Sequence, residues 1–189
     1  MCRYAFKIYK FHYVCFRCRK TFKQTPVDDI LLRIKKDKVY HELNGKSIRK
    51  VGQVFTKKEI SSLKELSSEI ENRTIKCPEC SHQMVNLGKD FKAPKISATK
   101  EWKIIEGLYR IGKTFFSCGC DGIGYIPQNE RDYKDYLEKV LTDYQDSIKF
   151  YQNVTFEEYS DKTERINYWS EKKLKIELEI KNIKVEDLE

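Results

Sequence analysis

Hydrophobic residues recur at helical spacing in two stretches of the first third of the chain. The stretch "TPVDDILLRIKKDK" has Pro26 and Asp28 near a helix start, followed by apolar residues at helical spacing, namely Ile30, Leu31 and Ile34. Thr56 and Glu59 form a capping box, and one apolar face follows it: Ile60, Leu63, Leu66 and Ile70. Between the two predicted helices, Asn44-Gly45 is a typical hairpin turn, so "KVYHEL" and "KSIRKVGQV" are expected to pair.

A third helix is predicted after the basic loop "GKDFKAPKIS". Thr99 stands where a helix cap is expected, and "KEWKIIEGLYRIG" then places three apolar side chains on one face: Trp102, Ile105 and Tyr109. Gly112 occupies the position of a C-terminal glycine. The segment "KTFFSCGCDGIGYIP" follows as a strand, a glycine-rich turn and an extended exit, and we place a domain boundary at Pro127.

The last third of the chain is predicted to form a helical hairpin. Its first helix, "NERDYKDYLEKVLTDYQDSIKFYQ", carries an apolar stripe that includes Tyr133, Tyr144 and Tyr151. A second helix is expected from about Asp161, with an apolar face containing Ile166, Trp169, Leu174 and Ile176. From Leu174 onward, apolar and charged residues alternate as they do in a strand, although the residue types favour a helix, so the element type of 172–184 stays open.

Short extended segments bracket two Cys-x-x-Cys motifs. The first motif, within "YVCFRCRKTF", lies between "FKIYKFHYV" and "TFKQT", and the second, within "KCPECSH", lies between "RTIK" and "QMVNLG". Two such turns supply four thiolates to one tetrahedral ion, and the spacing lets backbone amides of each turn point at the sulfurs. We therefore predict one Zn²⁺ held by Cys15, Cys18, Cys77 and Cys80. With four protein ligands, this zinc has no open coordination position and is structural.

This pattern resembles the zinc-ribbon superfamily over roughly residues 4–25 and 73–92, and in its basic front it resembles small bacterial zinc-ribbon proteins, including those that bind ribosomal RNA. The 58 residues between the motifs exceed the spacing of about 15 to 20 that is usual in compact two-pair sites. We interpret the excess as an insertion in the ribbon. The alternative is two unrelated redox or packing motifs.

Charge is distributed unevenly along the chain. Residues 1–128 carry 26 Lys and Arg against 13 Asp and Glu, a balance of +13, whereas residues 129–189 carry 11 against 16, a balance of −5. Such asymmetry is typical of a basic surface for polyanions joined to a region with another role. The N-terminus has no secretory apolar stretch and no segment is apolar enough for a membrane span, so we expect a cytoplasmic protein without membrane contact.

The basic front of the chain is the candidate nucleic-acid surface. Residues 1–25 contain seven basic side chains, seven aromatic ones and no acid, and cations among exposed rings suit phosphates and unstacked bases. The predicted contact residues are Lys7, Tyr9, Lys10, Phe11, Tyr13, Phe16, Arg17, Arg19 and Lys20, joined by Lys89, Lys92 and Lys95 of the basic loop. The alternative is a lysine-rich ribbon surface whose aromatic residues fill a small core.

A Cys-x-Cys motif, "SCGCDG", raises three alternatives. Cys118 and Cys120 form a packed glycine turn, contribute to a second metal site, or act as a redox pair. Catalytic signals are otherwise poor, because the chain has three histidines and lacks the common phosphate-loop, nucleophile-elbow and zinc-protease motifs. We do not expect an enzyme.

These observations predict an α+β protein: a zinc-ribbon domain over 1–127 with a mostly helical insertion at about 25–72, followed by an acidic helical region over 128–189. The predicted function is RNA binding in association with ribosomes. The acidic helices would contact a protein partner or fold back on the ribbon. Two alternative functions are a protein-interaction adaptor and a thiol redox protein that uses Cys118 and Cys120.

Overall fold

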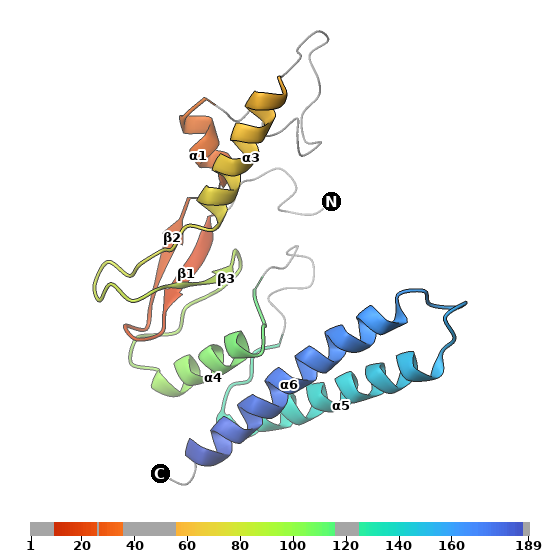
Figure 1. The fold of residues 1–189 in the computed structure, drawn as a ribbon. Helices are drawn as coiled ribbons and strands as arrows, with labels where there is room; N and C mark the ends of the chain where they lie inside the picture. Colours follow the sequence, from red (N-terminus) through yellow and green to blue (C-terminus); the bar gives the residue numbers. More distant parts are fainter. Residues whose placement is uncertain (1–9, 26, 36–55, 116–124, 187–189) are drawn as a thin grey trace, which may run out of the picture. The chain divides into compact units, whose positions relative to one another are not determined.

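The computed structural model describes residues 10–25, 27–35, 56–115 and 125–186. The chain divides into two compact units, Met1–Ala93 with Phe115–Ile123, and Pro94–Thr114 with Gly124–Glu189. Among the described residues, the first unit holds the sheet and helices α1 and α3, and the second holds helices α4, α5 and α6 (Figure 1). The mixed α+β class and the C-terminal helices that the sequence predicts are confirmed.

The first unit is built on a three-stranded antiparallel sheet in the order β2-β1-β3, formed by β1 (Phe11–Cys15), β2 (Lys20–Gln24) and β3 (Val85–Gly88). Strands β1 and β2 pair from Phe11↔Gln24 to Cys15↔Lys20, so the first cysteine motif is the turn of this hairpin. Because side chains alternate across a strand, Tyr13 and Cys15 share one face with Phe22, and this face packs on the cysteine cluster.

Gly88 ends β3 in a conformation that requires glycine. Its φ is +106°, which side chains with a Cβ rarely adopt, and a Cβ there would collide with the backbone carbonyl of Phe115. This close approach lets Phe115 continue the pairing beside β3: the amide of Phe115 donates to Leu87, and the amide of Asp90 donates to Phe115. Leu87 and Phe115 are both fully buried.

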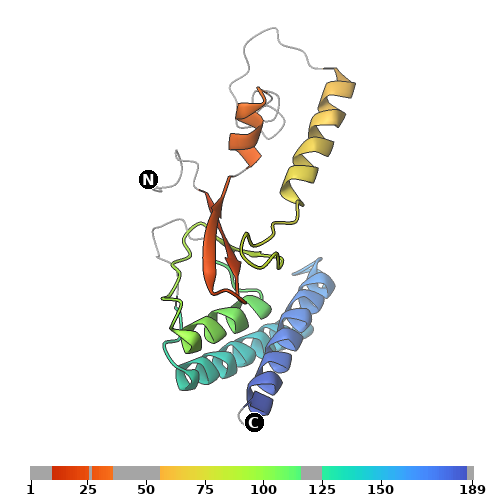
Figure 2. The same cartoon turned by 90° about the vertical axis from the view of Figure 1, so that its left-hand side faces the viewer.

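Helices α1 (Val27–Arg33) and α3 (Lys57–Glu71) follow β2 and precede the second cysteine motif. Both lie beyond the same end of the sheet, as Figures 1 and 2 show, and they contact each other. Arg73, just after α3, donates to the carbonyl of Thr25 at 2.8 Å, which ties the end of α3 to the end of β2. Both helices are where the sequence predicts them, and the predicted turn at Asn44-Gly45 lies outside the described residues.

The second unit contains α4 (Thr99–Arg110), α5 (Glu130–Asn153) and α6 (Lys162–Glu186), of which α5 and α6 form the predicted hairpin. Helix α6 continues to Glu186, so the segment 172–184 that the sequence leaves open is helical. Asn129 caps α5 by accepting the amide of Asp132 at 2.9 Å. The boundary proposed at Pro127 lies in the segment between α4 and α5.

Three details of these helices differ from the sequence prediction. Ala98 is the N-cap of α4, and Thr99 is its first helical residue, with no side-chain cap bond. Tyr109 is exposed, because the buried face of α4 runs through Trp102, Ile105 and Leu108. Leu174 is 56% exposed and lies away from the buried face of α6.

A buried carboxylate joins the three helices of the second unit. Glu179 of α6 is 1% exposed and accepts two bonds from the Arg110 guanidinium, at 2.7 and 2.8 Å, and one from the Tyr133 hydroxyl at 3.1 Å. Gly107 faces this group, since a Cβ there would collide with the Tyr133 hydroxyl and the Glu179 carboxylate. Burial and the neighbouring carboxylate raise the pKa of Tyr133, so its hydroxyl stays a donor.

Candidate metal centre

The four cysteines of the two Cys-x-x-Cys motifs lie together. Their sulfur atoms are all within 4.8 Å of one another, although 58 residues separate the motifs in the sequence. The Sγ of Cys15 lies 3.5 Å from that of Cys80, and the Sγ of Cys77 lies 3.9 Å from that of Cys18. The four thiols are free, and no disulfide joins them.

These distances fit a tetrahedral metal ion. Four sulfurs at about 2.3 Å from a central Zn²⁺ would be about 3.8 Å from one another, and the two measured separations lie on either side of that value. A disulfide would need a separation of about 2.05 Å. The cluster is therefore a site that could hold one metal ion and is compatible with zinc.

The two motifs form turns of the same local geometry. In each turn, the residue after the second cysteine has positive φ, at 52° for Arg19 and 58° for Ser81. The amide of Cys18 donates to the Cys15 thiol, and the amide of Cys80 donates to the Cys77 thiol. The sequence prediction that backbone amides point at the sulfurs is thus met in both turns.

The second turn is closed by its own backbone hydrogen bonds. The amide of Cys77 donates to His82 at 2.8 Å, and the amide of Met84 donates to Ile75 at 2.8 Å. Lys76 and Gln83 form a bridge between the two arms. His82 contributes its backbone to this turn, and its side chain is exposed.

An apolar layer lies under the cysteines. Ile75 and Met84 are buried with Cys15 and Cys77, and the half-buried rings of Tyr13 and Phe22 pack against them. The first cysteine of each motif is buried, at 1% and 2% exposure, and the second is half-buried. The sulfur cluster therefore caps a small core.

The electrostatics of the four thiols follow from their proximity. Burial opposes ionisation of Cys77, yet the donors around its sulfur, led by the amides of Cys80 and Glu79, lower its pKa to about 7. Hydrogen bonding to Cys80 and burial raise the pKa of Cys18 to about 12, and burial raises the pKa of Cys15. The thiol of Cys77 in the metal-free cluster thus ionises readily, whereas those of Cys15 and Cys18 need a cation to do so.

An ion pair between Lys20 and Glu79 links the two turns. Glu79 raises the pKa of Lys20, and both side chains are partly exposed at the surface of the cluster. The sequence analysis missed this pair, since nothing in the spacing indicates which basic residue near the first motif lies beside Glu79.

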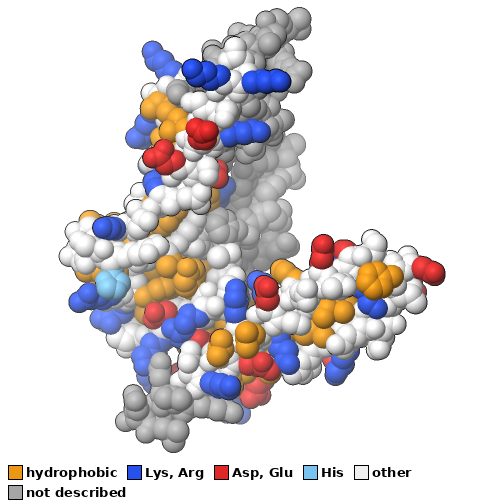
Figure 3. Space-filling model, viewed as in Figure 1, with side chains coloured by type: hydrophobic (Ala, Val, Ile, Leu, Met, Phe, Trp, Pro, Cys, Tyr) orange, Lys and Arg blue, Asp and Glu red, His pale blue; other side chains and the backbone are white. Residues whose placement is uncertain are grey.

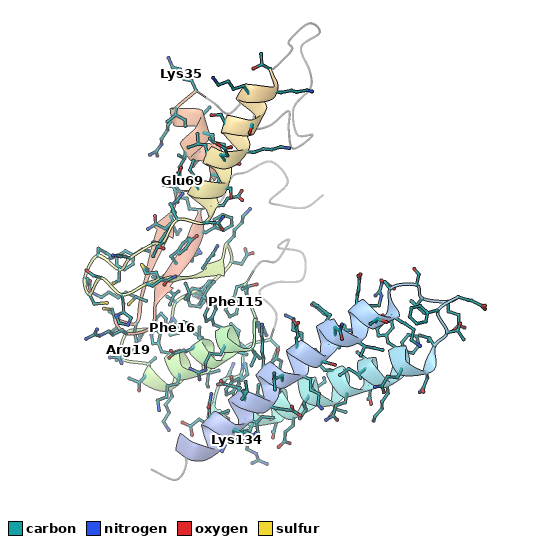
Figure 4. The ribbon with its side chains drawn as sticks, viewed as in Figure 1. Phe16, Arg19, Lys35, Glu69, Phe115 and Lys134 are labelled. Carbon is teal, nitrogen blue, oxygen red and sulfur yellow. The ribbon has the colours of Figure 1, made fainter. Side chains whose placement is uncertain are left out.

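The predicted nucleic-acid residues that the structure describes lie in several places. Phe16 and Arg17 lie on the first turn with Arg19, and Figure 4 shows Phe16 and Arg19 at the same end of the sheet. Arg17 and Lys10 are exposed, Lys20 pairs with Glu79, and Lys92 is exposed on the loop after β3.

Four further predicted residues are described by their ring contacts, their packing or the unit to which they belong. The ammonium of Lys89 lies 5.3 Å from the ring centre of Phe11, and Tyr13 packs on the cysteine core. Lys95 is exposed and belongs to the second unit. Lys7, Tyr9, Cys118 and Cys120 lie outside the described residues.

The second unit contains a pocket of about 220 Å³, and Glu179, Arg110 and Tyr133 form part of its wall. Three basic side chains line it, Lys100, Lys103 and Arg110, against three acidic ones, Glu106, Glu130 and Glu179. The equal numbers leave the pocket without the net charge that would favour an anion or a cation.

Comparisons of the chain with protein-family models, with curated proteins and with solved structures give no match. Within the parts of the chain that the structure describes, no helix is both long and apolar enough to cross a membrane. The arguments for function therefore rest on the cysteine cluster and the surface around it.

Proposed function

We propose that the chain is a cytoplasmic zinc-ribbon protein that binds RNA, with ribosomal RNA as the expected target, through the surface around its first cysteine turn. The observation that carries this proposal is the position of Phe16, Arg17 and Arg19 on a turn whose shape the metal would fix. Zinc is the proposed ion because a closed four-sulfur tetrahedral site is typical of it.

The charge of the first turn supports a polyanionic ligand. Residues 10–25 carry five Lys and Arg and no acid, and Glu79 on the second turn is already paired with Lys20. Within the described part of the first unit, 14 basic side chains stand against eight acidic ones. Phosphates would gain charge-assisted contacts here and release condensed counterions.

Aromatic side chains support RNA with unstacked bases. Phe16 lies on the first turn between the two cysteines, and Phe11 at the start of β1 carries Lys89 over its ring. Rings beside cations let bases stack while the phosphates are neutralised, and each stacked base contributes about 1–3 kcal/mol. Tyr13 has a different role in the proposal, since its ring packs on the cysteine core.

The test compares RNA binding by the whole chain with that of two variants of equal charge. In the first, Lys10, Arg17 and Arg19 become Gln; in the control, Lys139, Lys175 and Lys181 of the second unit, which are exposed, become Gln. Three lost phosphate contacts should reduce the slope of log K against log salt by about 2 on single-stranded RNA. The control should retain the wild-type slope.

Cell lysates supply the ribosomal part of the test. Cosedimentation with ribosomal particles should be lost at high salt, after RNase treatment and in the Lys10, Arg17, Arg19 variant, and should persist in the control variant. A protein that sediments slowly under every condition, or binding that salt leaves unchanged, would count against RNA and in favour of a protein-interaction adaptor.

A further inference from the structure

The far end of the α5–α6 hairpin presents aromatic side chains to solvent. Residues 143–168, which we call the hairpin tip, include Phe150 and Phe156, at 50% and 61% exposure. Figure 3 shows hydrophobic side chains on the surface there, with acidic side chains beside them. The tip is distinct from the RNA surface proposed above and lies in the other unit.

Three aromatic side chains of the tip, Phe150, Tyr151 and Tyr159, form one cluster. The ring of Phe150 lies 5.2 Å from that of Tyr151 and 5.9 Å from that of Tyr159, and the rings of Tyr151 and Tyr159 are 5.6 Å apart. These pairs stand edge to face, at interplanar angles of 78–86°. The cluster is thus a packed platform in which half of the Phe150 surface stays exposed to solvent.

The loop that joins the helices is held by its own hydrogen bonds. Thr155 and Glu158 form a reciprocal capping box: the Thr155 amide donates to the Glu158 carboxylate at 2.9 Å, and the Glu158 amide donates to the Thr155 hydroxyl at 3.3 Å. The Lys162 ammonium donates to the Val154 carbonyl at 2.6 Å and lies over the ring of Phe156. The exposed rings are therefore fixed before any ligand arrives, which reduces the entropy cost of binding.

The charge around the cluster is negative. Residues 143–168 carry six Asp and Glu against three Lys and Arg, a balance of −3. All three basic side chains are engaged within the tip: Lys149 pairs with Asp146 at 3.4 Å, and Lys162 covers Phe156. Arg165 pairs with Asp161 at 2.8 Å while its guanidinium lies over the ring of Tyr151. This field repels phosphates and favours a basic partner.

We infer that the hairpin tip is a docking surface for a basic segment of another protein that carries at least one large apolar side chain. Phe150 and Phe156 are the anchors, because rigid aromatic side chains dominate the binding energy of most protein interfaces. The acidic side chains around them, such as Glu157 and Glu164, contact the basic flanks of the segment and select it.

Short random peptides displayed on phage provide the probe. The full chain is panned, and clones that also bind the Phe150→Ala/Phe156→Ala variant are removed. The matched control is Leu174→Ala/Leu178→Ala, which removes apolar side chains of similar exposure, 56% and 51%, from α6 outside the tip. Circular dichroism checks that both variants keep the helical hairpin.

The expected peptides combine Lys and Arg with a large apolar residue. They should lose affinity about 30-fold or more on the Phe150, Phe156 variant, as hot-spot residues do, and keep it on the Leu174, Leu178 control. Glu157→Gln/Glu164→Gln should reduce the salt dependence of their binding.

Four results would overturn the inference. The first is enrichment of no peptide, or of peptides without basic residues. The second is equal binding to the Phe150, Phe156 variant. The third is a concentration-dependent dimer of the free chain that this variant abolishes, which would assign the tip to a second copy. The fourth is loss of RNA binding in the tip variant, which would assign the tip to RNA.

Discussion

The buried carboxylate of the second unit allows a sharp test of how this unit is held together. Glu179 is 1% exposed, whereas the Arg110 side chain that donates two bonds to it is 42% exposed. Replacing Arg110 by Met removes the charge partner and leaves the carboxylate inside the protein. Replacing Glu179 by Met instead leaves a guanidinium that regains water by a small movement.

The size of the first effect follows from the chemistry of a stranded carboxylate. Removing one partner of a buried ion pair lowers the free energy of unfolding by about 3–5 kcal/mol. Protonation limits this cost: keeping a glutamate neutral at pH 7 costs about 3.7 kcal/mol, because its ordinary pKa is about 4.3 and each pH unit corresponds to about 1.4 kcal/mol. We expect Arg110→Met to lower the free energy of unfolding of the second unit by about 3–4 kcal/mol at pH 7.

The same reasoning gives a pH dependence and a smaller effect for the reverse change. At pH 5 the cost of protonation falls to about 1 kcal/mol, so Arg110→Met should regain most of the lost stability there. Glu179→Met should cost about 1–2 kcal/mol, since it mainly leaves the Tyr133 hydroxyl without its acceptor.

Urea denaturation followed by tryptophan fluorescence measures these values. Trp102 and Trp169 are the two tryptophans of the chain, and both belong to the second unit. Arg165→Met is the control, because Arg165 also pairs with a carboxylate at 2.8 Å, but that of Asp161 is 43% exposed. Its effect on the free energy of unfolding should be much smaller than that of Arg110→Met, because water screens an exposed pair. The reasoning is refuted if Glu179→Met costs as much as Arg110→Met, or if the cost of Arg110→Met is the same at both pH values.

The remaining predictions concern the first unit. Cys77→Ser should abolish tight zinc binding and the fold of the unit together. The charge-transfer absorbance of a cobalt-loaded sample checks metal binding and circular dichroism checks the fold; a folded metal-free variant would contradict the prediction. Because the pKa values of Cys15 and Cys18 are raised, zinc binding to the metal-free chain at pH 7 should release at least about two protons, and the affinity for zinc should fall as the pH falls. An indicator dye measures the released protons, and release of fewer would refute this prediction. Gly88→Ala should destabilise the unit by more than about 1 kcal/mol, because the positive φ and the Phe115 carbonyl both exclude a Cβ, and an unchanged zinc-loaded melting temperature would contradict it.

Local patterns in the sequence predict most of the elements and the four cysteines of the candidate metal site. The capping box at Thr56 and the apolar stripe from Tyr133 to Tyr151 both lead to the helices observed, because each signal depends only on neighbours within one or two turns. The four cysteines are predictable despite their distance in the sequence, since a metal constrains its ligands in space and each pair carries its own spacing signal.

Other features depend on contacts between elements and carry no local signal. Glu179 stands in an alternating run of charged and apolar residues, where nothing distinguishes it from Glu177, yet one is buried and the other partly exposed. Its environment is decided by Arg110 of another helix and by the missing Cβ of Gly107. The prediction that Tyr109 belongs to the buried face of α4 is wrong for the same reason. Helical spacing indicates which residues share a face, but not which part of that face another element covers.

The two faces of α6 differ little in hydrophobicity, and this bears on the proposed partner. Helix α6 packs mainly on α5, and Ile176 with Trp169 supplies the apolar face for this contact. The ring of Trp169 lies 5.2 Å from that of Tyr144 of α5. Leu174 and Leu178 lie elsewhere on the same helix, exposed but held by no cluster of the kind found at the tip. Isolated exposed leucines are ordinary in proteins, whereas a packed aromatic platform within an acidic surface is not. The α5–α6 hairpin therefore offers both the candidate docking site and its internal control. A partner that distinguishes Phe150 and Phe156 from the two leucines must recognise the arrangement of the tip rather than exposed apolar surface in general.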